Sequence, residues 1–308
     1  MNNISEQEGK KSIFIPDRKS KLISLAEAGK IIADCKTLHL GGGTIVDGPM
    51  ALIRVAIRAG AKDLTVIPPV ASGIATDLLI AAGCVKKLYV SFINFEFLGF
   101  APAFKKAGET NSIDIIEADE PFLVLGTRAA AMNLPFIPVR NVYEATDLLK
   151  LNPLLGHVKD PYTGEDVVTI PPLKSDVCII HAELADERGN AQCWGGNQQE
   201  WDMAMSADKV IISAEQIVTV HKTRENPSKT TVPGHMVDAV VHIPYGAHPT
   251  AAAGFYHFDT EHMRLYMDHV SSGKSDEYLS RFVLEPKDHY EYLERIGLRS
   301  ILDLPTTW

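Results

Sequence analysis

Three consecutive glycines, Gly41 to Gly43, follow a short strand-like run that ends at Leu40. Glycine allows a sharp turn after a strand and lets backbone N–H groups approach an anion or a carbonyl oxygen closely. The motif is neither a Walker A loop, because no Gly-Lys-Ser/Thr follows, nor a GxGxxG fingerprint. Its spacing fits a tight turn without a ligand as well as it fits a ligand loop. We take Gly41, Gly42 and Gly43 as candidate binding residues.

A second candidate loop, Pro68 to Gly73, also follows a strand-like run. In open α/β sheets, ligands bind beyond the carboxyl ends of the strands, which is where both loops are expected to lie. Ser72 is not in a GxSxG elbow, so we expect it to form a hydrogen bond or cap a helix rather than act as a nucleophile. Ser72 and Gly73 are therefore candidate binding residues.

Two acidic positions complete the set of candidates. Glu96 lies between Phe95 and Phe97 after another strand-like run, where it is either a buried acid, which is costly, or a solvated acid at the rim. Phe95 and Glu96 are taken as candidate binding residues. Glu120 ends the acidic segment 117–120 before an alanine-rich helix, where acids cap the helix and oppose its dipole. That structural role explains Glu120 without a function, so a catalytic role must rest on other grounds.

The spacing of metal-ligating residues does not indicate a metal site. The sequence has 11 histidines and 4 cysteines, with no CxxC pair and no HxxxH or HxH with an acidic companion. The scattered cysteines predict buried, reduced thiols rather than disulfides.

Composition limits the classes of partner. The chain has 308 residues, 45% of them hydrophobic, and a formal net charge of −9. An acidic surface argues against nucleic acid or an anionic membrane as partner, because both require clustered cations. No apolar run reaches the roughly 18 residues of a membrane span, and the polar start lacks the apolar stretch of a signal peptide. We expect a cytoplasmic protein that binds neither nucleic acid nor membrane.

Strand-like runs alternate with helical segments along most of the chain, which predicts βαβ units and a parallel sheet. The expected fold is α/β: one open, largely parallel sheet with helices on both faces and a C-terminal helical extension after Gly254. Residues 1–21 are expected to form a flexible polar arm and residues 22–308 a single domain, with a surface excursion at 152–172. The expected strands are 37–40, 64–67, 87–93, 113–117, 177–181, 210–212 and 237–241.

In chain order, a set of segments resembles the A (alpha) subunit of the class I CoA-transferases of the glutaconate CoA-transferase type. One such segment would be weak, but the ordered set is specific and spans roughly residues 37 to 304. The segments that carry the resemblance are His39–Gly43, Pro49–Gly60, Leu134–Arg140, Asp176–Ala182, Val237–Val241, Pro244–Pro249 and Lys287–Leu293.

The resemblance implies the CoA-transferase fold and a hetero-oligomer with a B-type subunit. In these transferases the nucleophile toward an acyl-CoA thioester is a glutamate of the B-type subunit, and this sequence contains nothing similar to its motif. The chain would then supply site walls and oxyanion contacts, with acyl-CoA and a carboxylic acid as small-molecule ligands and no tightly bound cofactor. The candidates Gly41–Gly43, Ser72–Gly73, Phe95 and Glu96 become candidate substrate or CoA contacts.

The resemblance also leaves alternatives open. Family members commonly have Arg-Lys-Pro where this chain has Asp47-Gly48-Pro49, which predicts a weaker contact to a substrate carboxylate or CoA phosphate. Homologues on the same fold open a carbon ring in steroid-derived CoA thioesters by hydrolysis or decarboxylate 3-methylglutaconyl-CoA. Glu120 resembles in position the acid of the ring-opening branch, so it is the candidate catalytic residue of a hydrolase or lyase. A third possibility is a subunit that only positions CoA esters.

Overall fold

A single large sheet forms the centre of the molecule in the computed structural model, which describes residues 19–140, 143–195 and 199–306. The sheet has eight strands in the order β11-β10-β8-β1-β2-β3-β4, and β9 pairs with β8. All neighbours along this path are parallel, and β9 is antiparallel to β8. The strands are β1 (Thr37–Leu40), β2 (Leu64–Ile67), β3 (Val85–Val90), β4 (Asp114–Glu117), β8 (Ser175–Asp186), β9 (Ala191–Gln192), β10 (Ala207–Val218) and β11 (Ala239–His242).

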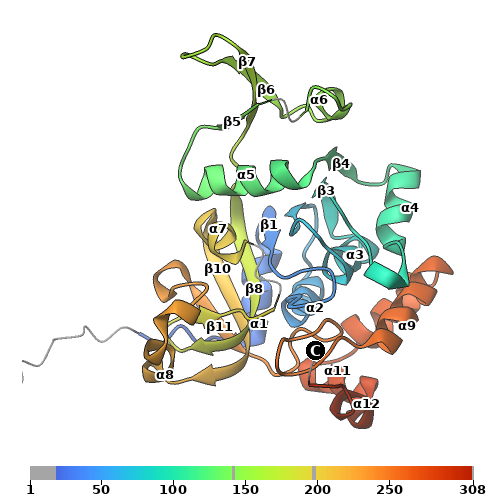
Figure 1. Cartoon of the computed structure of the whole chain (residues 1–308). Helices are drawn as coiled ribbons and strands as arrows, with labels where there is room; N and C mark the ends of the chain where they lie inside the picture. The colour runs from blue at the N-terminus through green and yellow to red at the C-terminus, as the bar shows by residue number, and fades with distance from the viewer. Residues whose placement is uncertain (1–18, 141–142, 196–198, 307–308) are drawn as a thin grey trace, which may run out of the picture.

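Helices cover both faces of this sheet, as expected from the sequence (Figure 1). One face packs on α1, α2, α3 and α4, while α7 and the nearby loops cover the other face at β8 and β10. The first seven helices are α1 (Leu25–Ala33), α2 (Met50–Arg58), α3 (Ile74–Ala81), α4 (Pro102–Thr110), α5 (Glu120–Ala131), α6 (Leu148–Leu151) and α7 (Glu200–Met205). The remaining helices are α8 (Val220–Glu225), α9 (Thr260–Ser271), α10 (Ser275–Leu279), α11 (His289–Ile296) and α12 (Leu298–Leu302).

Strand β8 shows how the alternation of side chains builds two cores. Val177 and Ile179 belong to the core under α1–α4, whereas Cys178 and Ile180 belong to the core under α7. Successive side chains of a strand point to opposite faces, so a strand covered on both faces is apolar throughout. This explains why the run at 177–181 has no polar alternation.

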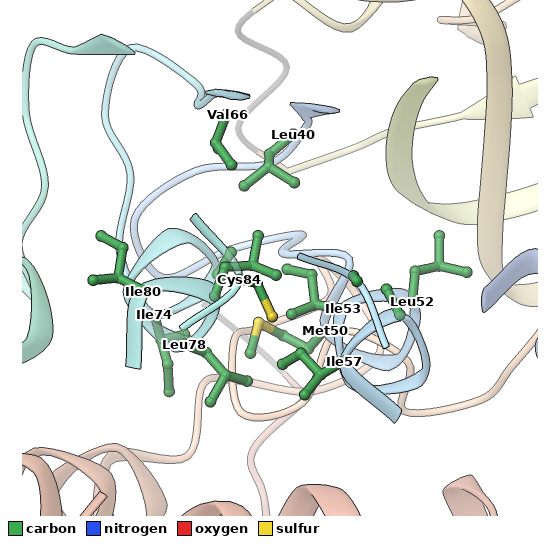
Figure 2. Packing of buried hydrophobic residues seen from close by; sticks show 14 of the residues in the cluster. Leu40, Met50, Leu52, Ile53, Ile57, Val66, Ile74, Leu78, Ile80 and Cys84 are labelled. Carbon is green, nitrogen blue, oxygen red and sulfur yellow. The ribbon is translucent and has the colours of Figure 1, made fainter. Parts of the chain in front are cut away.

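Helix α2 is the centre of the larger core. Eight of its nine residues are buried. Figure 2 shows Met50, Ile53 and Ile57 of this helix directed toward the side chains of α3, below Leu40 and Val66 of the two central strands. The contact places α2 and α3, which begin directly after two rim loops, in fixed positions against the sheet.

A second sheet of three antiparallel strands, in the order β5-β7-β6, stands apart from the main sheet (Figure 1). Its strands are β5 (Ile137–Val139), β6 (Gly156–Lys159) and β7 (Asp166–Ile170). The sequence predicts only an irregular surface excursion here. The turn between β6 and β7 explains the difference, because Asp160 accepts hydrogen bonds from Tyr162 N–H at 2.8 Å and Gly164 N–H at 2.9 Å and so closes a hairpin.

The two ends of the described chain are fixed to the body. The expected polar arm at 1–21 lies mostly outside the described residues, but Lys21 donates its ammonium to the carbonyl oxygen of Gly234 at 2.6 Å. The C-terminal extension is helical as expected, and its α9, α10 and α11 pack against the core through Met263, Tyr266, Tyr278 and Tyr292. The boundary of a single domain at residue 22 stays a prediction. None of the helices in the described ranges combines the length and the apolar character needed to span a membrane.

Asp77 joins three helices at one buried carboxylate. It lies on α3 and accepts the N–H groups of Ala103 (3.2 Å) and Phe104 (2.7 Å), at the start of α4. Its other partner is the hydroxyl of Tyr266 on α9, at 2.7 Å. Burial raises the pKa of Asp77 to about 6, and these three hydrogen bonds oppose the shift.

We expect Asp77→Ala to lower the free energy of unfolding by about 3 kcal/mol or more, because it leaves buried donors on two helices without an acceptor. Tyr266→Phe, which removes only one donor, should cost about 1 kcal/mol. Urea unfolding of both variants and the parent chain measures the difference. Equal losses in the two variants would contradict the role of Asp77 as the joint between these helices.

Candidate functional site

The glycine turn after β1 lies at the carboxyl edge of the sheet. Gly41 continues the sheet by donating its N–H to the carbonyl oxygen of Ile179 at 2.9 Å. Gly42 has φ +85, and a Cβ there would overlap the backbone carbonyl of Asp47, so only glycine fits. Gly43 N–H closes the turn on the carbonyl oxygen of Val46 at 2.8 Å.

Two backbone N–H groups of the glycine turn have no acceptor within the described residues. They are the N–H groups of Gly42 and Thr44. Free N–H groups at the carboxyl edge of a parallel sheet are the donors that stabilise a developing oxyanion or bind an anion. Whether the glycine turn binds a ligand stays a prediction.

The second predicted loop packs directly on the first. A Cβ at Gly73 would overlap the carbonyl oxygen of Thr44, so the two loops meet backbone to backbone. Helix α3 begins after Gly73 without any side-chain cap, which leaves the positive end of its dipole at this junction. Ser72 is fully buried and shares a 2.6 Å hydrogen bond with Thr76, so its hydroxyl faces the interior and not the rim.

The segment with the candidates Phe95 and Glu96 lies beside the second loop, but one of these side chains is in the core and the other in solvent. Ser72 forms a parallel bridge with Ile93, which places the two loops side by side. Phe95 is fully buried and stacks on Tyr266 with ring centroids 5.9 Å apart, so it is part of the core. Glu96 is exposed, as in the solvated alternative for this acid, and its N–H donates to Asn94 Oδ1 at 2.8 Å.

Glu120 lies at the start of α5, after β4. Its neighbour Asp119 caps this helix by accepting the N–H of Phe122 at 2.9 Å, as the acidic sequence predicts. Glu120 itself is exposed. A groove of 770 Å³ runs beside β4 and α4 and is lined by residues that include Phe92, Phe100 and Glu117. The carboxylate of Glu120 is therefore accessible, and it stands apart from the glycine turn at the edge strand of the sheet.

A cluster of buried acids that was not predicted from the sequence lies beside the glycine turn: Asp47, Glu183 and Glu200 are 3%, 0% and 2% exposed. Glu183 accepts two backbone N–H groups, from Trp194 at 2.7 Å and from Ala253 at 3.0 Å. Burial and the neighbouring acids Glu183 and Glu200 raise the pKa of Asp47 well above its ordinary value. Glu183 interrupts an otherwise apolar strand, and that interruption was the available sequence signal.

Cys193 lies among these acids and is not a nucleophile. It is buried, and burial together with Glu200 and Glu183 raises the pKa of its thiol well above the ordinary value. A thiol reacts through its thiolate, which this environment disfavours. Cys193 instead forms one wall of a 540 Å³ cavity whose other walls include Trp194, Trp201 and Lys229.

A hydrogen-bonded row of Ser213, His181 and Glu215 lies deeper in the sheet. The imidazole of His181 contacts Ser213 Oγ and Glu215 Oε1, each at 2.9 Å. The order resembles a hydrolytic triad, but Ser213 is fully buried between β8 and β10. Glu215 also accepts the hydroxyl of Tyr256 and the N–H of Tyr245, which joins the loop after β11 to the sheet. The row is structural, because a substrate has no route to its hydroxyl.

No group of three or more His, Cys, Asp or Glu side chains within residues 19–140, 143–195 and 199–306 is arranged to hold a metal ion. The acids at the glycine turn face one another and backbone donors. The groups available to a ligand at the carboxyl edge of the sheet are backbone N–H groups, the exposed Glu120 and the 540 Å³ cavity lined by Lys229.

Proteins of known function are similar to this chain in both sequence and structure. The A-type subunit of the glutaconate CoA-transferase of Acidaminococcus fermentans is 31% identical over 92% of this chain and 94% of its own. The crystal structure of that enzyme superposes with a TM-score of 0.87, at 30% identity over 92% of this chain and 95% of that one. An uncharacterized protein of Archaeoglobus fulgidus is 36% identical over 92% of this chain, which spans 65% of that protein's length.

Relatives with other reactions have the same fold. The IpdA subunit of a cholesterol ring-cleaving hydrolase from Rhodococcus jostii is 30% identical over 89% of this chain and 95% of its own. The decarboxylase AibA/AibB superposes with a TM-score of 0.77, at 32% identity over 85% of this chain and 98% of that one. The family model described as Coenzyme A transferase matches residues 22–242. The chain belongs to the Coenzyme A transferase family.

Proposed function

We propose that this chain is the A-type member of a two-subunit enzyme that transfers CoA between an acyl-CoA and a carboxylic acid. A B-type partner subunit carries the nucleophilic glutamate. The observation that carries the proposal is the division of chemistry at the rim: the free N–H groups of Gly42 and Thr44 suit an oxyanion, whereas the nearby acids are buried. The names of the curated relatives, among them the A-type subunit of a 3-oxoadipate CoA-transferase, support both the reaction and the partner.

The roles follow from the steps of the reaction. A carboxylate oxygen of the partner's glutamate attacks the thioester carbonyl, and the CoA thiolate leaves, giving an acyl anhydride. The thiolate then attacks the glutamyl carbonyl, releases the acyl carboxylate and forms a glutamyl thioester. Each attack produces an oxyanion, which in this proposal the free N–H groups of the glycine turn stabilise. The CoA thioester is a substrate, and the reaction requires no tightly bound cofactor.

The assembled pair of subunits should exchange CoA between acetyl-CoA and an acid acceptor, while this chain alone should be inactive, because the nucleophile is absent from it. Incubation with acyl-CoA should leave a hydroxylamine-sensitive glutamyl thioester on the partner subunit, detected by mass spectrometry. Robust turnover by this chain alone would contradict the proposal. Turnover by the partner alone, unchanged when this chain is added, would show that this chain has no role in the reaction.

A hydrolase or lyase reaction is the second candidate, and the exposure of Glu120 at the carboxyl edge favours it. An accessible carboxylate can serve as a general base toward water or an acidic α-proton. The ring-cleaving and decarboxylating relatives support the compatibility of this scaffold with such reactions.

Glu120→Ala distinguishes the two candidates. For a transferase, we expect kcat/KM of the assembled enzyme to stay within about twofold, because Glu120 contributes only to the end of α5. For a hydrolase or lyase, loss of a general base should lower kcat by about 100-fold or more. Glu117→Ala, at an exposed acid on the same rim, is the matched control. Loss of turnover in Glu120→Ala but not in Glu117→Ala, with no glutamyl thioester formed on the partner subunit of the parent enzyme, would overturn the transferase assignment.

A further inference from the structure

The side chain of Asp47 is directed into the protein and not toward a ligand. The residue has φ +53, in the left-handed region, and its carboxyl contacts Glu183. A Cβ at Gly195 would overlap Asp47 Oδ2, so the backbone of Gly195 also packs on this carboxyl. Asp47 therefore connects the end of the glycine turn to β8 and to the wall of the 540 Å³ cavity.

Hydrogen bonding at this contact is incomplete if both acids are ionised. Asp47 Oδ1 is buried and has no hydrogen-bond partner among the residues that the structure describes. Both oxygens of Glu183 are already occupied as acceptors, by the N–H groups of Trp194 and Ala253. Two ionised carboxylates in contact repel each other, and a buried oxygen without a partner is costly. One proton between the two groups removes the repulsion, because it makes Asp47 a donor to Glu183.

We infer that Asp47 and Glu183 share one proton, and that the resulting hydrogen bond positions the glycine turn for catalysis. Asp47 is a positioning residue in this inference, since it touches neither substrate nor the reacting atoms. The catalytic meaning of the turn rests on the proposed function, whereas the shared proton is a property of the folded chain alone.

Burial and the neighbouring acids favour the protonation of Asp47, and the backbone N–H of Ala253 opposes it. Glu200 at the start of α7 adds a second negative neighbour to Asp47, and Cys193 and Tyr256 lie close enough for Asp47 to affect their own ionisation. Burial and the two acids raise the pKa of Asp47, so the folded state holds a proton that the unfolded chain releases near pH 4.

The stability that the Asp47 contact contributes depends on pH. A group whose folded-state pKa is raised contributes stability that is fully present below its unfolded pKa and is lost as the pH rises through the folded pKa. The contact at Asp47 therefore weakens toward alkaline pH. Asp47→Asn replaces the shared proton with an amide N–H that donates to Glu183 at every pH.

The melting temperature of the isolated chain, measured from pH 5 to pH 9, tests the shared proton without any need for turnover. We expect the melting temperature of Asp47→Asn to rise relative to that of the parent by roughly 2 °C per pH unit, because the folded parent keeps a proton that its unfolded chain has released. Glu187→Gln, which removes an exposed acid on the segment after β8, should run parallel to the parent. Parallel curves for Asp47→Asn and the parent would overturn the inference.

A spectroscopic measurement on the parent protein remains decisive if the variant does not fold. At pH 8 the infrared spectrum should contain the carbonyl band of a protonated carboxylic acid, since Asp77, with a pKa of about 6, is then ionised. Absence of that band would overturn the shared proton. In the assembled enzyme, the alkaline fall of kcat in the parent should be reduced in Asp47→Asn, and an identical pH profile would overturn the positioning role.

Discussion

Backbone packs directly on backbone where the turn after β1 meets Asp47 on one side and Gly73 on the other. Gly42 and Gly73 leave no room for a side chain at these two contacts, so the loops after β1 and β2 hold each other in place. Helices α2 and α3 begin at the ends of these loops, and their apolar faces meet under the central strands, as Figure 2 shows. The position of the rim and the packing of the core are thus one constraint, because neither loop can move without displacing a buried helix.

The fold could be predicted from the sequence wherever burial and backbone chemistry agree. The runs at 37–40 and 64–67 are apolar and end at Gly41 and Pro68, and β1 and β2 have these same bounds. Strand β8 extends to Asp186, well past the predicted end at His181. The prediction stopped too early because Glu183 interrupts the apolar run, and its burial cannot be seen in the sequence. Its carboxylate is satisfied by N–H groups from segments that the sequence pattern does not connect to the strand. The hairpin of β6 and β7 was not predicted for a related reason: the proline and glycine residues on both sides of it favour irregular structure locally.

The candidate site was predictable in its backbone and less so in its side chains. The glycines at the carboxyl edge of the sheet can be recognised in the sequence, because a sharp turn after a strand requires them. The orientation of a side chain depends on tertiary neighbours: Ser72 turns to Thr76 and Phe95 turns to Tyr266, although both lie in rim loops. Whether these residues, with Gly41–Gly43, Gly73 and Glu96, contact a CoA ester stays a prediction. Asp47 drew notice in the sequence only as a departure from basic residues, and its contact with Glu183 requires the folded chain.

Charge at the rim explains why a shared proton suits an oxyanion site. The substrate proposed here is anionic, and its reaction builds further negative charge at the thioester oxygen. Three ionised acids beside the glycine turn would oppose that charge, and the low dielectric of a buried cluster would strengthen the repulsion. A proton on Asp47 removes one of these charges, and the carboxylate oxygens of Glu183 accept the N–H groups of Trp194 and Ala253. The free donors of Gly42 and Thr44 then dominate the local field, so an acidic neighbourhood can still favour an oxyanion.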